Sequence, residues 1–241
     1  MKLDILAFGA HPDDVELSCS GTILKNISFG KKVGIIDLTR GEMGTRGTPA
    51  IRSKEAEKAA KILGVAFREN LKMADGFFQN DKKHQLAVIQ KIRQYRPDVV
   101  LAPALEDRHP DHGRAAKLIA DACFLSGLIK IATKLKGKKQ ETWRPKGVYH
   151  YIQYRKLRPD FVIDISAFMS RKMEAIKAFG SQFFNPDSKE PATLISQPQF
   201  FDYVHKREEE YGEIINAKYG EGFNVMEEYK SEILIESFPK K

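Results

Sequence analysis

Short apolar runs alternate with helix-length segments along this chain, and this alternation constrains the fold more than any other feature of the sequence. Apolar residues dominate positions 3–10 and 33–38, and residues 15–28 between them carry an apolar face with helical spacing. Two such strands joined by a helix form a βαβ unit, in which the strands run parallel and are buried on both faces. The sequence therefore predicts a parallel sheet covered by helices.

The same pattern continues through the rest of the chain. Further helices are predicted over residues 52–63, 86–95, 113–124, 167–179 and 200–217, and further strands over 65–67, 98–104, 147–153 and 161–165. Residues 134–143 and 185–197 are predicted to be exposed loops rather than linkers. The predicted fold class is α/β, a three-layer α/β/α sandwich with a mostly parallel, Rossmann-like sheet. A length of 241 residues allows one large domain or two small ones, and the 42% hydrophobic content is enough for a substantial core. Because these loops do not look like linkers, a single domain over 1–241 is predicted.

The charge of the chain narrows the classes of partner. The net charge is +8, which favours acidic partners without identifying them. The densest basic run, Lys134 to Lys139, has no interleaved aromatic residues and accompanies no nucleic-acid-binding motif, so we expect a solvated loop and no nucleic-acid partner. No run of 18 apolar residues occurs, so no membrane partner is expected.

The cysteines and the amino terminus favour a reducing compartment. Cys19 and Cys123 lie in apolar-rich segments, outside any C-x-x-C pair, and are predicted to be buried thiols. Asp4 and the later aspartates interrupt any apolar core of a signal peptide. The predicted location is therefore cytoplasmic.

Two short polar motifs follow predicted buried strands. His11-Pro12-Asp13-Asp14 comes directly after the first strand, and His109-Pro110-Asp111-His112 follows the strand over 98–104. Ligand sites of open α/β sheets form at the carboxyl ends of the strands, so neighbouring strands would bring both motifs together. Imidazole and carboxylate groups are zinc ligands, and two histidines with one carboxylate leave an open position for water. The sequence therefore predicts a catalytic zinc site between the motifs.

Each motif also has a simpler interpretation. Aspartate is a good helix N-cap, so a single His-Pro-Asp could merely begin a helix. Two such motifs, each after a buried strand, make that interpretation much weaker for the pair. The other histidines are interpreted differently, with His84 and His205 as surface residues and His150 as a structural residue within a strand.

The motifs His11-Pro12-Asp13-Asp14 and His109-Pro110-Asp111-His112 together resemble the signature of the PIG-L/LmbE-like zinc deacetylases, which remove acetyl groups from N-acetylglucosamine derivatives. The resemblance covers nearly the whole chain. It is closest to the subgroup that makes bacillithiol by hydrolysing the acetamide of N-acetylglucosaminyl malate. The segments that carry this closer resemblance are Gly41-Glu42-Met43-Gly44-Thr45-Arg46-Gly47, Arg52, Glu55-Ala56, Leu63-Gly64-Val65, Asp75-Gly76, Lys172-Met173-Glu174-Ala175-Ile176 and Ser181-Gln182-Phe183.

The resemblance implies a role for each residue of the site. It implies one Zn²⁺ per chain, a small sugar-conjugate substrate and assembly as a homo-oligomer, a trimer or hexamer. Many relatives have a histidine just before Ser-Gln-Phe, which this chain lacks, so the far wall of the pocket is left undefined. The implied roles are His11, Asp14 and His112 as zinc ligands, Asp13 as general base, His109 as the group that stabilises or protonates the intermediate, Arg52 and Asp75 as sugar-binding residues, and Asp111 as an outer residue that orients an imidazole.

Two other functions stay open at this point. One is deacetylation or amide hydrolysis of another substrate, such as a chitooligosaccharide or a thiol conjugate. The other is a basic nucleotide-binding module without catalysis. The glycine-rich loop lacks the lysine spacing of a phosphate-binding loop, and Gly9 does not begin a G-x-G-x-x-G motif, so the non-enzymatic function is disfavoured.

Overall fold

A seven-stranded sheet forms the centre of the computed structural model, which describes residues 1–225. The strand order is β3-β2-β1-β4-β7-β9-β8. The five strands from β3 to β7 are mutually parallel, and β9 is antiparallel to both of its neighbours. The strands are β1 (Ile5–Gly9), β2 (Val33–Thr39), β3 (Phe67–Met73), β4 (Val99–Ala102), β7 (Gly147–Tyr151), β8 (Phe161–Asp164) and β9 (Gly220–Val225).

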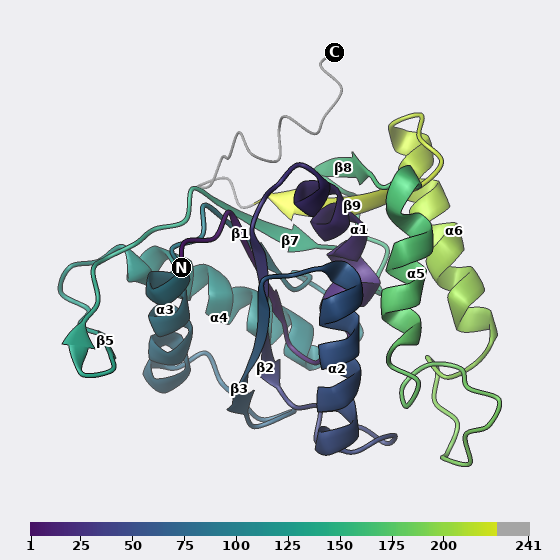
Figure 1. The fold of residues 1–241 in the computed structure, drawn as a ribbon, viewed down its shortest axis with the longest axis horizontal. Helices are drawn as coiled ribbons and strands as arrows, with labels where there is room; N and C mark the ends of the chain where they lie inside the picture. The colour runs from purple at the N-terminus through teal and green to yellow at the C-terminus, as the bar shows by residue number, and fades with distance from the viewer. Residues whose placement is uncertain (226–241) are drawn as a thin grey trace.

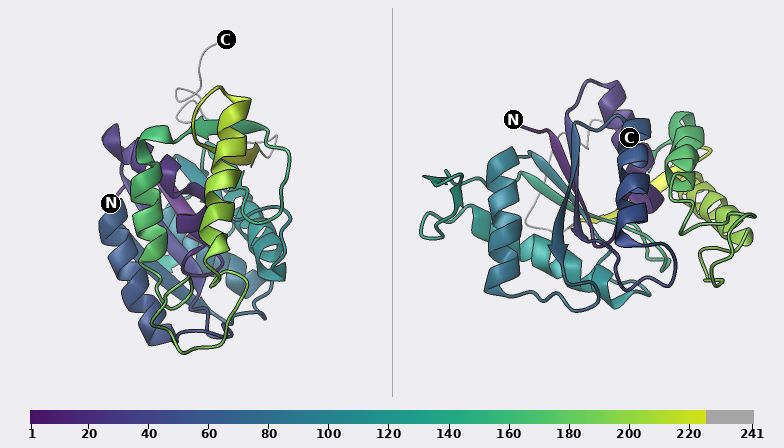
Figure 2. Two further views of the ribbon diagram at one scale, coloured as in Figure 1. Left: turned by 90° about the vertical axis from the view of Figure 1, so that its right-hand side faces the viewer. Right: turned by 60° about the horizontal axis from the view of Figure 1, so that its bottom comes forward.

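Helices cover both faces of this sheet (Figures 1 and 2). One face is covered by α3 and α4, and the other by α1, α2 and α5, with α6 packed over β8 and β9. The predicted three-layer, mostly parallel α/β architecture is therefore confirmed. The helices are α1 (Asp14–Ser28), α2 (Pro49–Leu63), α3 (Lys82–Tyr95), α4 (Pro110–Ser126), α5 (Met169–Lys177) and α6 (Gln199–Ile214).

Each face of the sheet packs against its helices through a hydrophobic core, because side chains along a strand point alternately to the two faces. On β1, Ile5 and Ala7 pack on the side of α1, whereas Leu6 and Phe8 pack on the side of α3 and α4. All four side chains are fully buried. A strand that is buried on both faces contains a continuous apolar run, which is why the central strands could be predicted from the sequence. Within residues 1–225, no helix combines the length and apolar composition that crossing a bilayer requires.

Three parts of the fold differ from the prediction. The short strand expected at 65–67 is β3 (Phe67–Met73), a mostly polar strand that, among residues 1–225, forms the edge of the sheet and pairs with β2 alone. The strand β9 (Gly220–Val225) was not predicted, because its two glycines interrupt the apolar pattern that marks a strand. Part of the segment expected as a loop at 134–143 forms the exposed hairpin of β5 (Lys134–Leu135) and β6 (Lys138–Lys139).

Candidate active site

A cavity of about 210 Å³ opens at the carboxyl ends of the parallel strands. The loops after β1, β2, β3, β4 and β7 all contribute residues to its wall. The chain leaves β1 toward β2 on one side, whereas β4 lies on the other side of β1. The cavity therefore lies at the point where the strand order reverses, which is where open α/β sheets bind their ligands.

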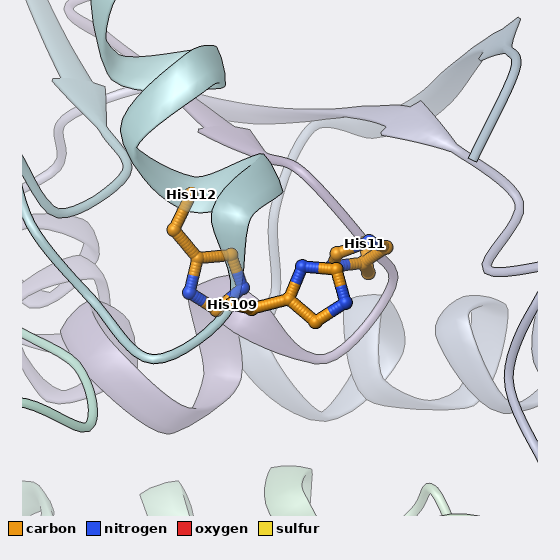
Figure 3. A group of neighbouring side chains, drawn as sticks. All are labelled: His11, His109 and His112. Carbon is orange, nitrogen blue, oxygen red and sulfur yellow. The ribbon is translucent and has the colours of Figure 1, made fainter. Parts of the chain in front are cut away.

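Three imidazoles from the two motifs meet in this cavity (Figure 3). One ring nitrogen each of His11, His109 and His112 lies within 4.8 Å of the other two. The Asp14 carboxylate joins them, with Oδ1 3.2 Å from His112 Nε2 and Oδ2 3.5 Å from His11 Nδ1. The structure therefore brings together His11, Asp14 and His112, and it adds His109 as a further nitrogen donor. This donor set of imidazoles and a carboxylate fits zinc.

Asp14 is held in place by donors on two sides. Its Oδ2 accepts a hydrogen bond of 2.8 Å from the His11 backbone N–H, and its Oδ1 accepts one of 2.8 Å from Gln153 Nε2. Burial favours the neutral acid, but the charge of His112 and the bonds from both histidines outweigh it and hold the Asp14 pKa well below its usual range. Asp14 is therefore an ionised carboxylate suited to a cation. The role of Gln153 was not predicted.

Asp13 has a different environment from its neighbour. It precedes the first turn of α1 with a left-handed φ of 118°, a conformation that non-glycine residues rarely adopt. Its Oδ2 accepts a hydrogen bond of 3.1 Å from Arg52 Nη2. Burial raises the Asp13 pKa to about 7, and the nearby Asp14 charge adds to this effect while Arg52 opposes it. The two adjacent carboxylates therefore face different partners.

His109 serves as the N-cap of α4. Its Nδ1 accepts a hydrogen bond of 3.2 Å from the Asp111 backbone N–H. Burial lowers the His109 pKa, and the charges of His11 and His112 lower it further. A neutral ring whose Nδ1 is an acceptor carries its proton on Nε2. His109 can therefore donate a hydrogen bond from Nε2 to a group in the cavity.

The carboxylate that orients His112 is Asp107, which was not predicted. Asp107 Oδ2 lies 2.6 Å from His112 Nδ1, and Asp107 Oδ1 accepts hydrogen bonds from the backbone N–H groups of Arg108 and Arg155. Asp111, expected to orient an imidazole, lies beside the ring of His11, with Oδ2 3.4 Å from His11 Nε2, so its predicted role stays a prediction. In the sequence, Asp107 is distinguished only by being a carboxylate shortly before the second motif.

Replacing Asp107 by asparagine should weaken zinc binding by about ten- to a hundredfold, because outer carboxylates fix the orientation and basicity of metal-binding histidines. Competition with a chromophoric chelator measures this affinity. Asp81→Asn is the matched control, since Asp81 makes the same carboxylate–imidazole contact to His84 at 2.8 Å outside the cavity. Equal zinc affinity in the wild type and Asp107→Asn would contradict the assignment.

Arg52 and Asp75 both line the cavity, as expected for residues near the substrate. Arg52 Nη2 donates to Pro12 O at 2.5 Å as well as to Asp13, and its Nη1 donates to Gly41 O at 3.2 Å. Asp75 Oδ1 lies 2.9 Å from His11 Nε2, and its Oδ2 accepts from the Met43 N–H. Burial raises the Asp75 pKa, but the hydrogen bond and charge of His11 outweigh it and lower the pKa to about 2. Their predicted contact with a sugar stays a prediction.

Aromatic and apolar side chains form the far wall, which the sequence left undefined. Tyr154 and Tyr203 lie with ring centres 5.4 Å apart, and the Arg108 guanidinium lies 5.3 Å from the ring centre of Tyr154. Phe200 and Ile195 complete this wall. His150 is buried in β7 and does not line the cavity.

Comparison with known proteins agrees with this geometry. Residues 6–123 match the model of the family PIG-L, described as GlcNAc-PI de-N-acetylase. The chain is 29% identical to diacetylchitobiose deacetylase of Thermococcus kodakarensis, over 92% of this chain and 82% of that one. It is 28% identical to a probable N-acetyl-alpha-D-glucosaminyl L-malate deacetylase of Bacillus anthracis, over 74% of this chain and 81% of that one. The crystal structure of a conserved protein from Thermus thermophilus superposes with a TM-score of 0.82 at 36% identity, covering 93% of this chain and 94% of that one.

Proposed function

This chain belongs to the PIG-L family, and from that membership we propose that it is a metal-dependent N-deacetylase acting on an N-acetylglucosamine conjugate. The reaction is hydrolysis of the acetamide to acetate and a free amine. The observation that carries the proposal is the meeting of both motifs in one cavity, with Asp14 against His11 and His112 while Asp13 pairs with Arg52.

The proposed metal is one Zn²⁺ per chain, held by His11, Asp14 and His112. These groups supply the nitrogen and oxygen donors that zinc prefers, and they come from the two segments that follow β1 and β4. When bound, zinc acts as a Lewis acid that activates water and polarises a carbonyl group. Asp107 and Gln153 orient two of the three ligands.

Asp13 and His109 are the proposed catalytic residues. Asp13 can accept a proton from the attacking water, because its raised pKa brings it near neutrality. Arg52 holds the carboxylate in position. His109 can donate from Nε2 to the oxygen on which negative charge develops. The proton held by Asp13 then passes to the leaving amine.

The proposed substrate is N-acetylglucosaminyl malate, as in bacillithiol biosynthesis. Arg108 supports an anionic aglycone, because its guanidinium lies at the cavity and makes no ion pair with any residue in 1–225. Arg46, another cation of the sequence motif, is instead occupied by the backbone carbonyl of Ser181 and the hydroxyl of Ser188. Arg52 is occupied by Asp13.

Diacetylchitobiose is the second candidate substrate. The identity to the Thermococcus kodakarensis enzyme extends over 92% of this chain, further than the similarity to the malate deacetylase. The Tyr154 and Tyr203 rings offer an apolar face against which a second sugar ring could pack. A panel of both conjugates and free N-acetylglucosamine, assayed for acetate with Zn²⁺ and with a chelator, decides between them. Absence of acetate from every acetamide in the presence of metal would overturn the proposed activity.

Arg108→Gln should raise the KM for N-acetylglucosaminyl malate by about tenfold or more, because a charged hydrogen bond to a carboxylate contributes about 1.5–3 kcal/mol. The KM for diacetylchitobiose should change much less. Arg155→Gln is the control, since Arg155 is an exposed neighbouring cation that does not line the cavity. An equal effect of Arg108→Gln on both substrates would remove the support for malate.

We also propose that the protein is one domain that works in the cytoplasm as a homo-oligomer, a trimer or hexamer. Resemblance to the family supports the assembly, and the two buried cysteines fit a reducing compartment. Light scattering after gel filtration tests the assembly, and a purely monomeric protein would overturn it.

A further inference from the structure

The helix that carries Asp14 is interrupted one turn after it begins. Cys19 has φ −142° and ψ 15°, which divides α1 into a short first segment, residues 14–18, and a longer second one. A five-residue segment is far below the length at which a helix is stable alone. Tertiary contacts must therefore hold the segment that carries the proposed metal ligand Asp14.

Buried charged side chains meet the backbone on both sides of this interruption. Glu221 accepts hydrogen bonds from the backbone N–H groups of Gly21 at 2.9 Å and Thr22 at 2.7 Å. Arg207 Nη2 donates to the carbonyl of Leu17 at 2.5 Å. Glu221 thus places a negative charge at the amino end of the second segment, and Arg207 places a positive charge at the carboxyl end of the first. Both charges have the sign that stabilises the helix end they contact.

These two charges are connected by two more. Lys172 Nζ lies 2.6 Å from Glu221 Oε1 and 2.8 Å from Glu208 Oε1, and Glu208 Oε1 lies 2.5 Å from Arg207 Nη2. None of the four side chains is more than 5% exposed. The row alternates in sign and crosses from β9 through α5 to α6. Lys172 lies in a segment that contributes to the family resemblance but that the proposed reaction does not use.

The row ends at the proposed metal site. Arg207 also donates to the backbone carbonyl of Gln153, whose side-chain amide donates to Asp14 Oδ1 at 2.8 Å. One guanidinium therefore contacts both the helical turn that carries Asp14 and the residue that holds the Asp14 carboxylate. Arg207 and Gln153 both line the cavity, so the hydrogen bond between them lies at the cavity wall.

We propose that Arg207 is a positioning residue for the Asp14 carboxylate, acting through the Leu17 carbonyl and Gln153. Glu208, Lys172 and Glu221 hold Arg207 in this position from the protein interior. The inference rests on the proposed function, because it concerns the geometry of a proposed metal ligand. It adds that the zinc affinity of the site depends on a row of charges that does not touch the metal.

The test compares Arg207→Lys, Gln153→Met and the double variant with the wild type. Zinc dissociation constants come from competition with a chromophoric chelator on metal-free protein, and melting temperatures come from circular dichroism. Arg93→Lys is the matched control, because Arg93 is also a buried arginine that donates to backbone carbonyls, those of Ser126 and Leu128, away from the cavity.

Each single variant at the site should weaken zinc binding by about tenfold or more, as outer groups of metal sites generally do. The double variant should lose less affinity than the product of the two single losses, because both act on the same carboxylate. Arg93→Lys should lower the melting temperature and leave the zinc affinity unchanged.

Unchanged zinc affinity in Arg207→Lys, with a lowered melting temperature like that of Arg93→Lys, would overturn the inference and leave Arg207 a purely structural residue. Fully multiplicative losses would overturn the part of the inference in which Arg207 acts through Gln153. If Arg207→Lys does not fold, Gln153→Met decides alone, and wild-type affinity there overturns the inference. A wild type that binds no zinc would instead overturn the proposed function itself, which separates the two failures.

Discussion

Replacing His112 by alanine should lower zinc affinity by more than about a hundredfold and reduce acetate release to background. Removing a residue that only orients a metal ligand typically weakens metal binding by about ten- to a hundredfold, and removing a ligand itself should weaken it more. His112 Nε2 lies 3.2 Å from Asp14 Oδ1, and His112 Nδ1 is held by Asp107. Its removal leaves two of the three proposed ligands, fewer than a catalytic zinc site requires. Metal content of the purified variant and acetate release with added Zn²⁺ measure the two effects.

His84→Ala is the control for this prediction, since His84 on α3 pairs with Asp81, the residue before this helix, and does not line the cavity. The companion variant His109→Ala distinguishes two ligand sets, because His11, His109 and His112 also lie close enough together to share an ion. With Asp14 as ligand, His109→Ala keeps its zinc and loses turnover. Loss of zinc from His109→Ala but not from Asp14→Asn would assign the metal to the three imidazoles. Full zinc occupancy in His112→Ala would refute both sets.

The sequence predicted the central sheet and the place of the site because both depend on local patterns. The strands β1, β2 and β4 are buried on both faces, so each contains a continuous apolar run. Both motifs follow such runs directly or within a few residues, and the parallel pairing of β1 with β4 brings them together. The rule that ligands bind at the carboxyl ends of parallel strands then sufficed to locate the cavity.

The residues that support the site could not be predicted, because their roles depend on contacts between distant segments. Gln153 lies 139 residues from the Asp14 carboxylate that it holds, and Arg207 lies 190 residues from the Leu17 carbonyl. Nothing near Gln153 or Arg207 in the sequence marks a metal site. The role of Glu221 could not be predicted either. It lies between two glycines, which interrupt the apolar pattern that marks a strand, on a strand that packs closely against its neighbours.

The different partners of Asp13 and Asp14 bear on a question that the motif alone leaves open, namely which carboxylate binds the metal. Asp14 contacts His11 and His112, whereas Asp13 has a left-handed backbone and contacts Arg52. Because the two carboxylates contact different partners, a single ion is not expected to bind both in the same way. This geometry supports Asp14 as the ligand and Asp13 as the base.

Asp13→Asn should therefore bind zinc with near-normal affinity while its turnover falls by about a hundredfold or more, the usual contribution of a general base. Asparagine is the informative replacement, because it tolerates a left-handed backbone and keeps the shape of aspartate while removing its basicity. Asp14→Asn should show the opposite pattern, with metal affinity lost first. Zinc stoichiometry and the deacetylation rate, measured on both variants side by side, distinguish the roles.

Loss of metal from Asp13→Asn with retention in Asp14→Asn would exchange the two assignments. Full activity in Asp13→Asn would show that the base is another residue. His109 is then the next residue to test, because its ring lies close to two proposed ligands, with its centre 4.7 Å from that of His11 and 5.4 Å from that of His112.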